Sequence, residues 1–165
     1  MKKRTQILVA LLSLMMFLVC LPGVGAAATL TPPPPTEGKV SSNLHSSIVV
    51  NIHTDTSTQG VSLIKQWVCG IADNSNGIVT ITGETTTYGT VEYLDAKIYL
   101  QRWNGSSWVD VTSRTYSASS NFYTRGSSNI SVTSGSYYRT RGIHNAHNAG
   151  NYDAQSSVSD AILVQ

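Results

Sequence analysis

Apolar and polar residues alternate along much of the chain with the period of two that is typical of β-strands. The clearest example is VEYLDAKIYLQRW, residues 91–103, where Leu94, Ala96, Ile98 and Leu100 share one face. Runs rich in β-branched and aromatic residues, separated by Gly, Asn and Ser, predict further strands at residues 61–70, 78–86, 108–116, 121–125, 129–132, 137–144 and 157–164. The sequence therefore predicts an all-β fold, an antiparallel β-sandwich of about seven to eight strands over residues 61–165.

The strands at residues 91–103 and 108–116 form the strongest local unit, a β-hairpin. Asn104-Gly105 is the preferred pair for a two-residue turn, which would place Asp95 opposite Arg114. A four-residue loop would instead place Lys97 opposite Arg114. Because like charges directly opposite each other destabilise a sheet, we expect the two-residue turn. In either case the pattern predicts that Val109 and Val111 lie on the apolar face.

Residues 1–28 follow a different pattern. A basic patch at residues 2–4 precedes an apolar run at residues 7–21, and small residues follow as far as Ala28. This order predicts a secretory signal peptide that is cleaved after Ala26 or Ala28. The apolar run is shorter than the ~20 residues that span a bilayer. We therefore expect a secreted, extracellular protein that contacts a membrane only through this peptide, before cleavage.

Residues 29–60 predict a flexible stalk. All five prolines lie in the first 35 residues, and TPPPPTEG is typical of a polyproline spacer. The rest of the segment is rich in Ser, Thr and Asn. Its one apolar run, SIVVNIH at residues 47–53, is a candidate strand in an otherwise mobile arm.

Loss of the signal peptide would change both the charge and the cysteine content. Eight Lys and Arg would then face nine Asp and Glu, so the remaining chain is close to neutral. This balance argues against nucleic acid as a partner. Cys69 would be the one cysteine left, next to Trp67 and Val68, and we expect it to be a buried, unreactive thiol. We also expect Trp67 to lie in the core.

The segment YYRTRGIHNAHNAGN, residues 137–151, predicts a strand with an inward-facing side that leads into a loop. Tyr138, Thr140, Gly142 and His144 would face inward, residues 144–151 would form the loop, and SVSDAILV would form a last strand. This order resembles the end of immunoglobulin-like and fibronectin-type-III-like sandwiches, where a tyrosine begins the penultimate strand. Thr140 stands where an immunoglobulin domain would carry its second cysteine.

Three motifs carry a second resemblance: IYLQRWNGSSWVDVTS, YYRTRGIHNAHNAG and SSVSDAILV. They resemble an uncharacterised family of small secreted all-β proteins from Gram-positive spore-forming bacteria. The resemblance implies export and an all-β domain. It implies no activity and no catalytic residues.

Candidate metal and catalytic residues are few. His144, His147 and Asp153 could supply two imidazoles and a carboxylate, but a three-residue spacing aligns metal ligands on a helix and not on a strand. DNSNG, residues 73–77, lacks the closing glutamate of a calcium loop and fits a turn. There is no G-x-S-x-G motif and no evident carboxylate pair. We therefore expect no metal, no cofactor and no enzymatic activity, with a hydrolase as the alternative.

The outward face of the predicted sheet is the strongest candidate site. Aromatic rings can stack on sugars, and guanidinium groups can bind carboxylate or phosphate. The most plausible function is therefore a non-enzymatic recognition module, extracellular or at the cell surface, for a cell-wall glycan, teichoic acid or another extracellular polysaccharide. The alternatives are an antimicrobial or toxin-like effector and a self-associating matrix or coat component. The residues expected on this face are Tyr99, Trp103, Trp108, Arg114, Arg139 and Arg141, together with Tyr93, Lys97 and Tyr116.

Overall fold

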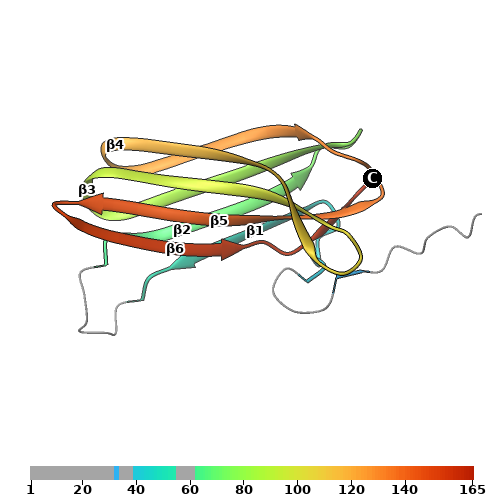
Figure 1. Ribbon diagram of the computed structural model, residues 1–165, viewed down its shortest axis with the longest axis horizontal. Coiled ribbons are helices and arrows are strands. Elements are labelled where there is room, and N and C mark those ends of the chain that lie inside the picture. Colours follow the sequence, from blue (N-terminus) through green and yellow to red (C-terminus); the bar gives the residue numbers. More distant parts are fainter. Residues whose placement is uncertain (1–31, 34–38, 55–61) are drawn as a thin grey trace, which may run out of the picture.

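The computed structural model describes residues 32–33, 39–54 and 62–165. These residues form an all-β fold of antiparallel strands, as predicted (Figure 1). None of them forms a helix that could cross a membrane. The predicted signal peptide and residues 29–31, 34–38 and 55–60 of the predicted stalk lie outside the described residues. The strands are β1 (Ser46–Ile52), β2 (Ile64–Asp73), β3 (Ile78–Trp103), β4 (Trp108–Ser131), β5 (Ser136–Asn148), β6 (Asn151–Val158) and β7 (Ile162–Val164).

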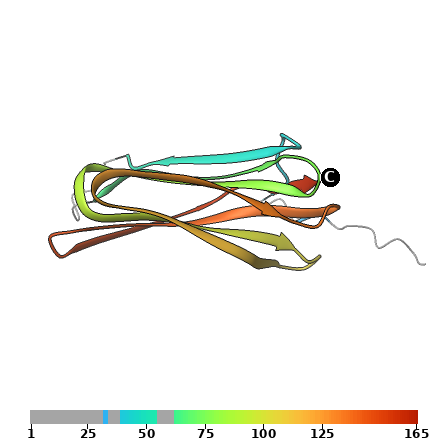
Figure 2. The same ribbon diagram turned by 90° about the horizontal axis from the view of Figure 1, so that it is seen from above.

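One curled sheet contains all of these strands. Its order is β1-β2-β3-β5-β6, with β4 also paired to β3 and β7 to β5. Strands β3 and β4 are long enough to run through both halves of the sheet. Residues 79–87 of β3 pair with β2, and residues 93–102 pair with β5. Between these two parts the β3–β4 register shifts after Thr86, and the chain doubles back so that two layers face each other (Figure 2).

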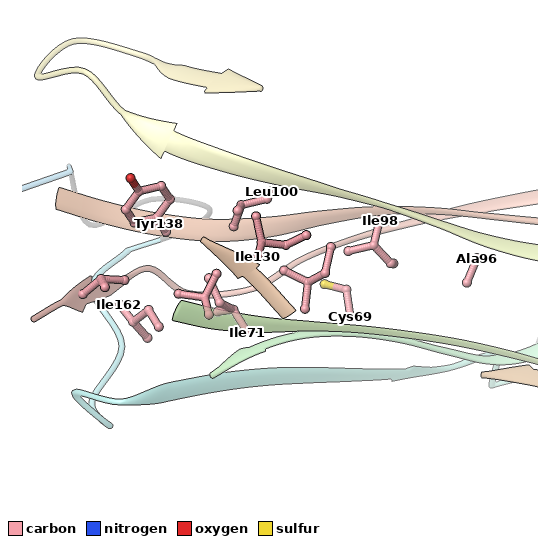
Figure 3. Close-up of a cluster of buried hydrophobic side chains, with 11 residues drawn as sticks. Cys69, Ile71, Ala96, Ile98, Leu100, Ile130, Tyr138 and Ile162 are labelled. Carbon is pink, nitrogen blue, oxygen red and sulfur yellow. The ribbon is translucent and has the colours of Figure 1, made fainter. Parts of the chain in front are cut away.

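The core lies between the two layers (Figure 3). Alternation along β3 points Ala96, Ile98 and Leu100 into it from one layer, while Cys69 and Ile71 of β2 enter from the other. Cys69 is fully buried, and its burial raises the pKa of the thiol. The prediction of a buried, free cysteine is therefore confirmed. The indole of Trp67 is partly buried and packs on a second cluster, where its Nε1 donates to Ser156 O over 2.8 Å.

The strand boundaries differ from the sequence prediction in four places. The strand predicted at residues 157–164 is divided between the end of β6 and β7. The strands predicted at residues 78–86 and 91–103 are one strand, β3, and those predicted between residues 108 and 132 are one strand, β4. The predicted loop at residues 144–151 is instead a hairpin. Strand β5 continues to Asn148 and β6 starts at Asn151, while Ala149 and Gly150 make a tight turn with φ of 48° and 79°. The candidate strand near residues 47–53 is β1, which pairs with β2 at the edge of the sheet.

The expected two-residue turn at Asn104-Gly105 is wrong. Trp103 lies opposite Trp108, so the loop has four residues. The side chain of Asn104 closes this loop, because its Oδ1 accepts hydrogen bonds from the backbone N–H groups of Ser106 and Ser107 at 2.9 and 2.8 Å. The local capping bonds therefore favour the longer loop over the two-residue turn.

The register between β3 and β4 shifts between Leu100 and Gln101, close to the hairpin loop. Without this shift, the four-residue loop would put Lys97 opposite Arg114. The shift moves Arg114 opposite Ile98 and leaves Lys97 opposite Thr115, so the two positive charges are not paired. It also moves the side chains beyond it in β4 to the other face, because a one-residue slip exchanges the two faces of a strand. The predicted pairing of Asp95 with Arg114 is therefore wrong, and Asp95 lies opposite Ser117.

Candidate functional site

The outward faces of β3 and β5 share one surface, as the sequence predicted. The register places Tyr99 opposite Arg141 and Gln101 opposite Arg139. On the other side of β3, Trp103 lies opposite Trp108 and Gln101 lies opposite Asp110. We call this surface the arginine–aromatic face and define it by Lys97, Tyr99, Gln101, Trp103, Trp108, Asp110, Arg139 and Arg141.

Each of the two arginines of this face lies over an aromatic ring. The guanidinium carbon of Arg139 is 4.4 Å from the ring centroid of Trp108, and that of Arg141 is 4.4 Å from the centroid of Tyr99. Lys97 Nζ lies 5.1 Å from the same Tyr99 ring. These distances are within the range of cation–π attraction, so rings on β3 and β4 hold the cations in place.

Two polar side chains connect the arginines. Gln101 accepts a 2.8 Å hydrogen bond from Arg139 Nε through its Oε1, and it donates a 2.6 Å hydrogen bond from its Nε2 to Asp110 Oδ1. The other oxygen of Asp110 lies 3.6 Å from a terminal nitrogen of Arg141. The sequence analysis does not include Gln101 and Asp110 in the candidate site. Their position between Tyr99, Trp103 and Trp108 was the available signal.

The arginine–aromatic face presents cations more than bare rings. Trp103 is buried, with 8 % of its surface exposed, and it packs on Trp108 at a centroid distance of 5.3 Å. Arg139 and Arg141 cover rings that would otherwise be open to a sugar, whereas the side chain of Arg141 itself remains 34 % exposed. Three cations and one carboxylate leave the face positive. This arrangement suits an anionic ligand better than a neutral one that needs an open aromatic platform.

Three predicted members lie away from this group. Arg114 is exposed on the other face of the sheet, where it bonds to Thr112 Oγ1 and Ser113 O. Tyr116 lies on that same face, packs against the core and bonds to Ser128 Oγ at 2.9 Å. Both corrections have the same cause, the register shift after Leu100. Tyr93 does lie on the predicted face but pairs with Ser119 and His147, further along the strands.

The candidate metal ligands are dispersed. Alternation along β5 buries His144 completely and leaves His147 on the outer face, where its Nδ1 is 3.2 Å from Glu92 Oε2. Asp153 Oδ2 instead accepts hydrogen bonds from Ser62 Oγ and from two backbone N–H groups. Across the described parts of the chain, no group of three His, Cys, Asp or Glu side chains could hold a metal ion.

An open cleft lies on the other side of the hairpin. Its volume is about 480 Å³, and it is lined by Tyr138 and by residues from both strands of the hairpin. The valines predicted to face the core, Val109 and Val111, line this cleft and are 45 % and 47 % exposed. The hairpin extends beyond the packed layers, so its apolar side is not covered there. Arg102 also lines this cleft.

No protein-family model matches this chain, and a search of curated proteins found no significant match. A functional assignment therefore depends on the geometry of the arginine–aromatic face.

Proposed function

We propose that the protein is an exported, non-enzymatic recognition module that binds an anionic extracellular polymer through the arginine–aromatic face. The phosphate groups of a teichoic acid and the carboxylates of an acidic polysaccharide have the required chemistry. The observation that carries the proposal is the stacking of Arg139 on Trp108 and of Arg141 on Tyr99.

Stacking supports anion binding because it fixes the guanidinium planes before the ligand arrives. A free arginine loses side-chain entropy when it is held by a ligand, and a pre-organised one loses less. The two arginines are separated by one residue along β5 and point to the same side. This spacing suits a polymer with repeated negative charges better than a single small anion.

Asp110 supports selectivity within the same face. Its carboxylate lies close to Arg141, with 47 % of its side chain exposed. A bound phosphate or carboxylate would compete with Asp110 for this guanidinium. A single, weakly bound anion would not displace Asp110 from Arg141. A polymer that contacts both arginines at once would bind more tightly, because its second contact is intramolecular.

The proposal can be tested by sedimenting the protein with purified cell-wall sacculi, with and without their teichoic acid. The test variant is Arg139→Gln/Arg141→Gln, and the matched control is Arg102→Gln/Arg114→Gln. Both variants remove two positive charges, but the control positions lie off the arginine–aromatic face. We expect the wild type and the control to sediment with teichoic-acid-bearing walls and the test variant to remain in solution. Binding should weaken as salt increases.

Two results would argue against the proposal. If the wild type does not bind walls or a soluble acidic polysaccharide at low salt, the face is not a recognition surface. If the control variant loses binding as much as the test variant, retention reflects overall charge and not this face. Thermal unfolding of each variant verifies that a loss of binding is not a loss of folding.

A further inference from the structure

Strand β1 carries an exposed apolar stripe. Ile48, Val50 and Ile52 are 66 %, 53 % and 58 % exposed, and they alternate along the strand, so their side chains share the outer face of the sheet. Single exposed apolar residues are common on protein surfaces, but three in a row on one strand form a continuous strip.

The same three residues carry backbone groups that point away from the sheet. His45 O accepts from Asp73 N, and His53 N donates to Lys65 O, so the odd-numbered residues of β1 make the bonds to β2. In an antiparallel pair, the residues between them direct their N–H and C=O groups to the opposite side. Among the described residues β1 pairs with β2 alone. Ile48, Val50 and Ile52 thus combine an open hydrogen-bonding edge with an apolar surface.

This edge lacks the features that keep sheet edges apart. Natural edge strands are protected by charged side chains, prolines, bulges or short length. The seven residues of β1, SSIVVNI, include no charge and no proline, and the β1–β2 register is continuous. The unpaired backbone groups of this edge therefore favour another β-strand as the partner. That strand should be apolar and uncharged, because a charged partner would find no opposite charge on β1.

Among the described strands, β1 itself meets this description. We propose that two copies of the chain pair through β1, antiparallel and related by a two-fold axis near Val50. This arrangement places Val50 opposite Val50 of the second copy and Ile48 opposite Ile52, so apolar side chains meet and no like charges are opposed. The two curled sheets then join into one continuous sheet.

Pairing through β1 would leave the arginine–aromatic face free, because that face is built from β3, β4 and β5. A pair of copies would present two such faces. Whether or not that face binds a polymer, pairing rests on β1 alone and is tested separately.

The experiment measures the mass of the chain in solution as a function of concentration by sedimentation equilibrium. The protein is expressed from residues 1–165 and purified after the processing that the host performs. We expect the mass to rise from one copy toward two over roughly 10 µM to 1 mM, since an interface made by one strand is small. Amide hydrogen exchange at Ile48, Val50 and Ile52 should slow at least several-fold over the same range, while Val49, already bonded to β2, should not change.

Three variants make the test specific. Val50→Pro removes an N–H that points outward and spares the bonds to β2, and Val50→Lys places a charge in the stripe. Val111→Lys changes a valine that is 47 % exposed at another site. We expect both Val50 variants to remain single copies and the Val111 variant to pair like the wild type.

A wild type that stays a single copy up to 1 mM overturns the proposal. So does a Val50→Pro variant that folds and still pairs, because edge pairing needs that N–H. Equal loss of pairing in Val111→Lys would show general apolar adhesion and would also overturn it. If Val50→Pro does not fold, the concentration dependence of exchange at the three amides of the wild type decides the question.

Discussion

Ser157 Oγ and His144 Nε2 meet inside the protein at 2.9 Å, and the other ring nitrogen of His144 lies 2.9 Å from Thr85 Oγ1. Thr85 donates its own hydroxyl proton to Asp95 O, so its oxygen accepts from His144 Nδ1–H. His144 Nε2 must then accept from Ser157. The chain of hydrogen bonds is complete only for a neutral imidazole. A serine–histidine pair of this length can suggest catalysis, but His144 is fully buried and Ser157 is 5 % exposed, so the pair serves packing.

The first prediction concerns pH. Burial lowers the pKa of His144 from 6.5 to about 4, with a backbone contact at Glu84 opposing the shift. Between pH 6.5 and 4, His144 is therefore protonated in the unfolded chain but neutral in the folded chain. The stability of the fold falls as the pH falls through this window. The expected loss from His144 is roughly 3 kcal/mol across the window. Urea unfolding at a series of pH values checks this.

The control for this prediction is His144→Gln, which keeps a polar side chain that does not titrate. This variant should be less stable than the wild type at pH 7 and should lose most of the dependence on pH between 6.5 and 4. An unchanged pH profile in the variant would show that another group is responsible. The other three histidines, His45, His53 and His147, are not buried.

The second prediction concerns Gly142. A Cβ at this position would lie 2.5 Å from both His144 Nε2 and Ser157 Oγ. Gly142→Ala should therefore destabilise the fold by about 2 to 4 kcal/mol, because it adds strain and separates a buried hydrogen-bonded pair. Gly89→Ala is the matched control, since nothing lies within 4 Å of a Cβ there. Thermal unfolding compares the two. Equal midpoints would contradict the packing around His144.

The alternation of the sequence predicted most of the fold. It gave the correct faces for β3 and for the inward side of β5, where Tyr138, Thr140 and His144 are buried as expected. The period of two is a property of each strand and can be read locally. The Ser- and Asn-rich stretches inside β4 predict breaks, because these residues favour turns. Pairing with β3 along the whole length overrode that preference.

The site was predictable only in part, and the reason is the register shift after Leu100. Tyr99, Arg139 and Arg141 lie on strands whose faces follow directly from alternation. Arg114 and Tyr116 lie beyond the shift in β4, so their faces are reversed. A bulge of one residue leaves no clear mark in composition. It depends on how the loop closes, and here that depends on hydrogen bonds made by Asn104.

The third prediction concerns Asp153. Burial alone would raise the pKa of its carboxyl group, but hydrogen bonds from Ile64 N, Ser62, Gln155 and Leu63 N reverse this, and the pKa lies below its usual value. The carboxylate thus fixes the start of β2, and its contribution to stability is present above the unfolded pKa and is lost as the pH falls through the folded pKa. Asp153→Asn should cost about 1 to 3 kcal/mol at neutral pH.

The measurement for Asp153→Asn is again urea unfolding, at pH 7 and at acid pH. The difference between the variant and the wild type should shrink as the pH falls, because the wild-type carboxyl group then becomes neutral too. Asp160→Asn is a suitable comparison, since Asp160 carries no such set of hydrogen bonds to its carboxylate in the described structure. A difference for Asp153→Asn that stays constant with pH would mean that shape, and not charge, holds this strand.

The last prediction tests the stacking of Arg141 on Tyr99 and the placement of Arg114 together. A double-mutant cycle of Arg141→Gln with Tyr99→Leu should give a coupling energy of about 0.5 to 1 kcal/mol in urea unfolding, because the guanidinium lies 4.4 Å from the ring centroid. The same cycle with Arg114→Gln should give a coupling near zero, since Arg114 lies on the other face of the sheet. Had the hairpin closed with a two-residue turn, Arg114 would share the face of Tyr99. Coupling of Tyr99 to Arg114 but not to Arg141 would therefore place the error in the register of β4, and the arginine–aromatic face would have to be redrawn from that strand.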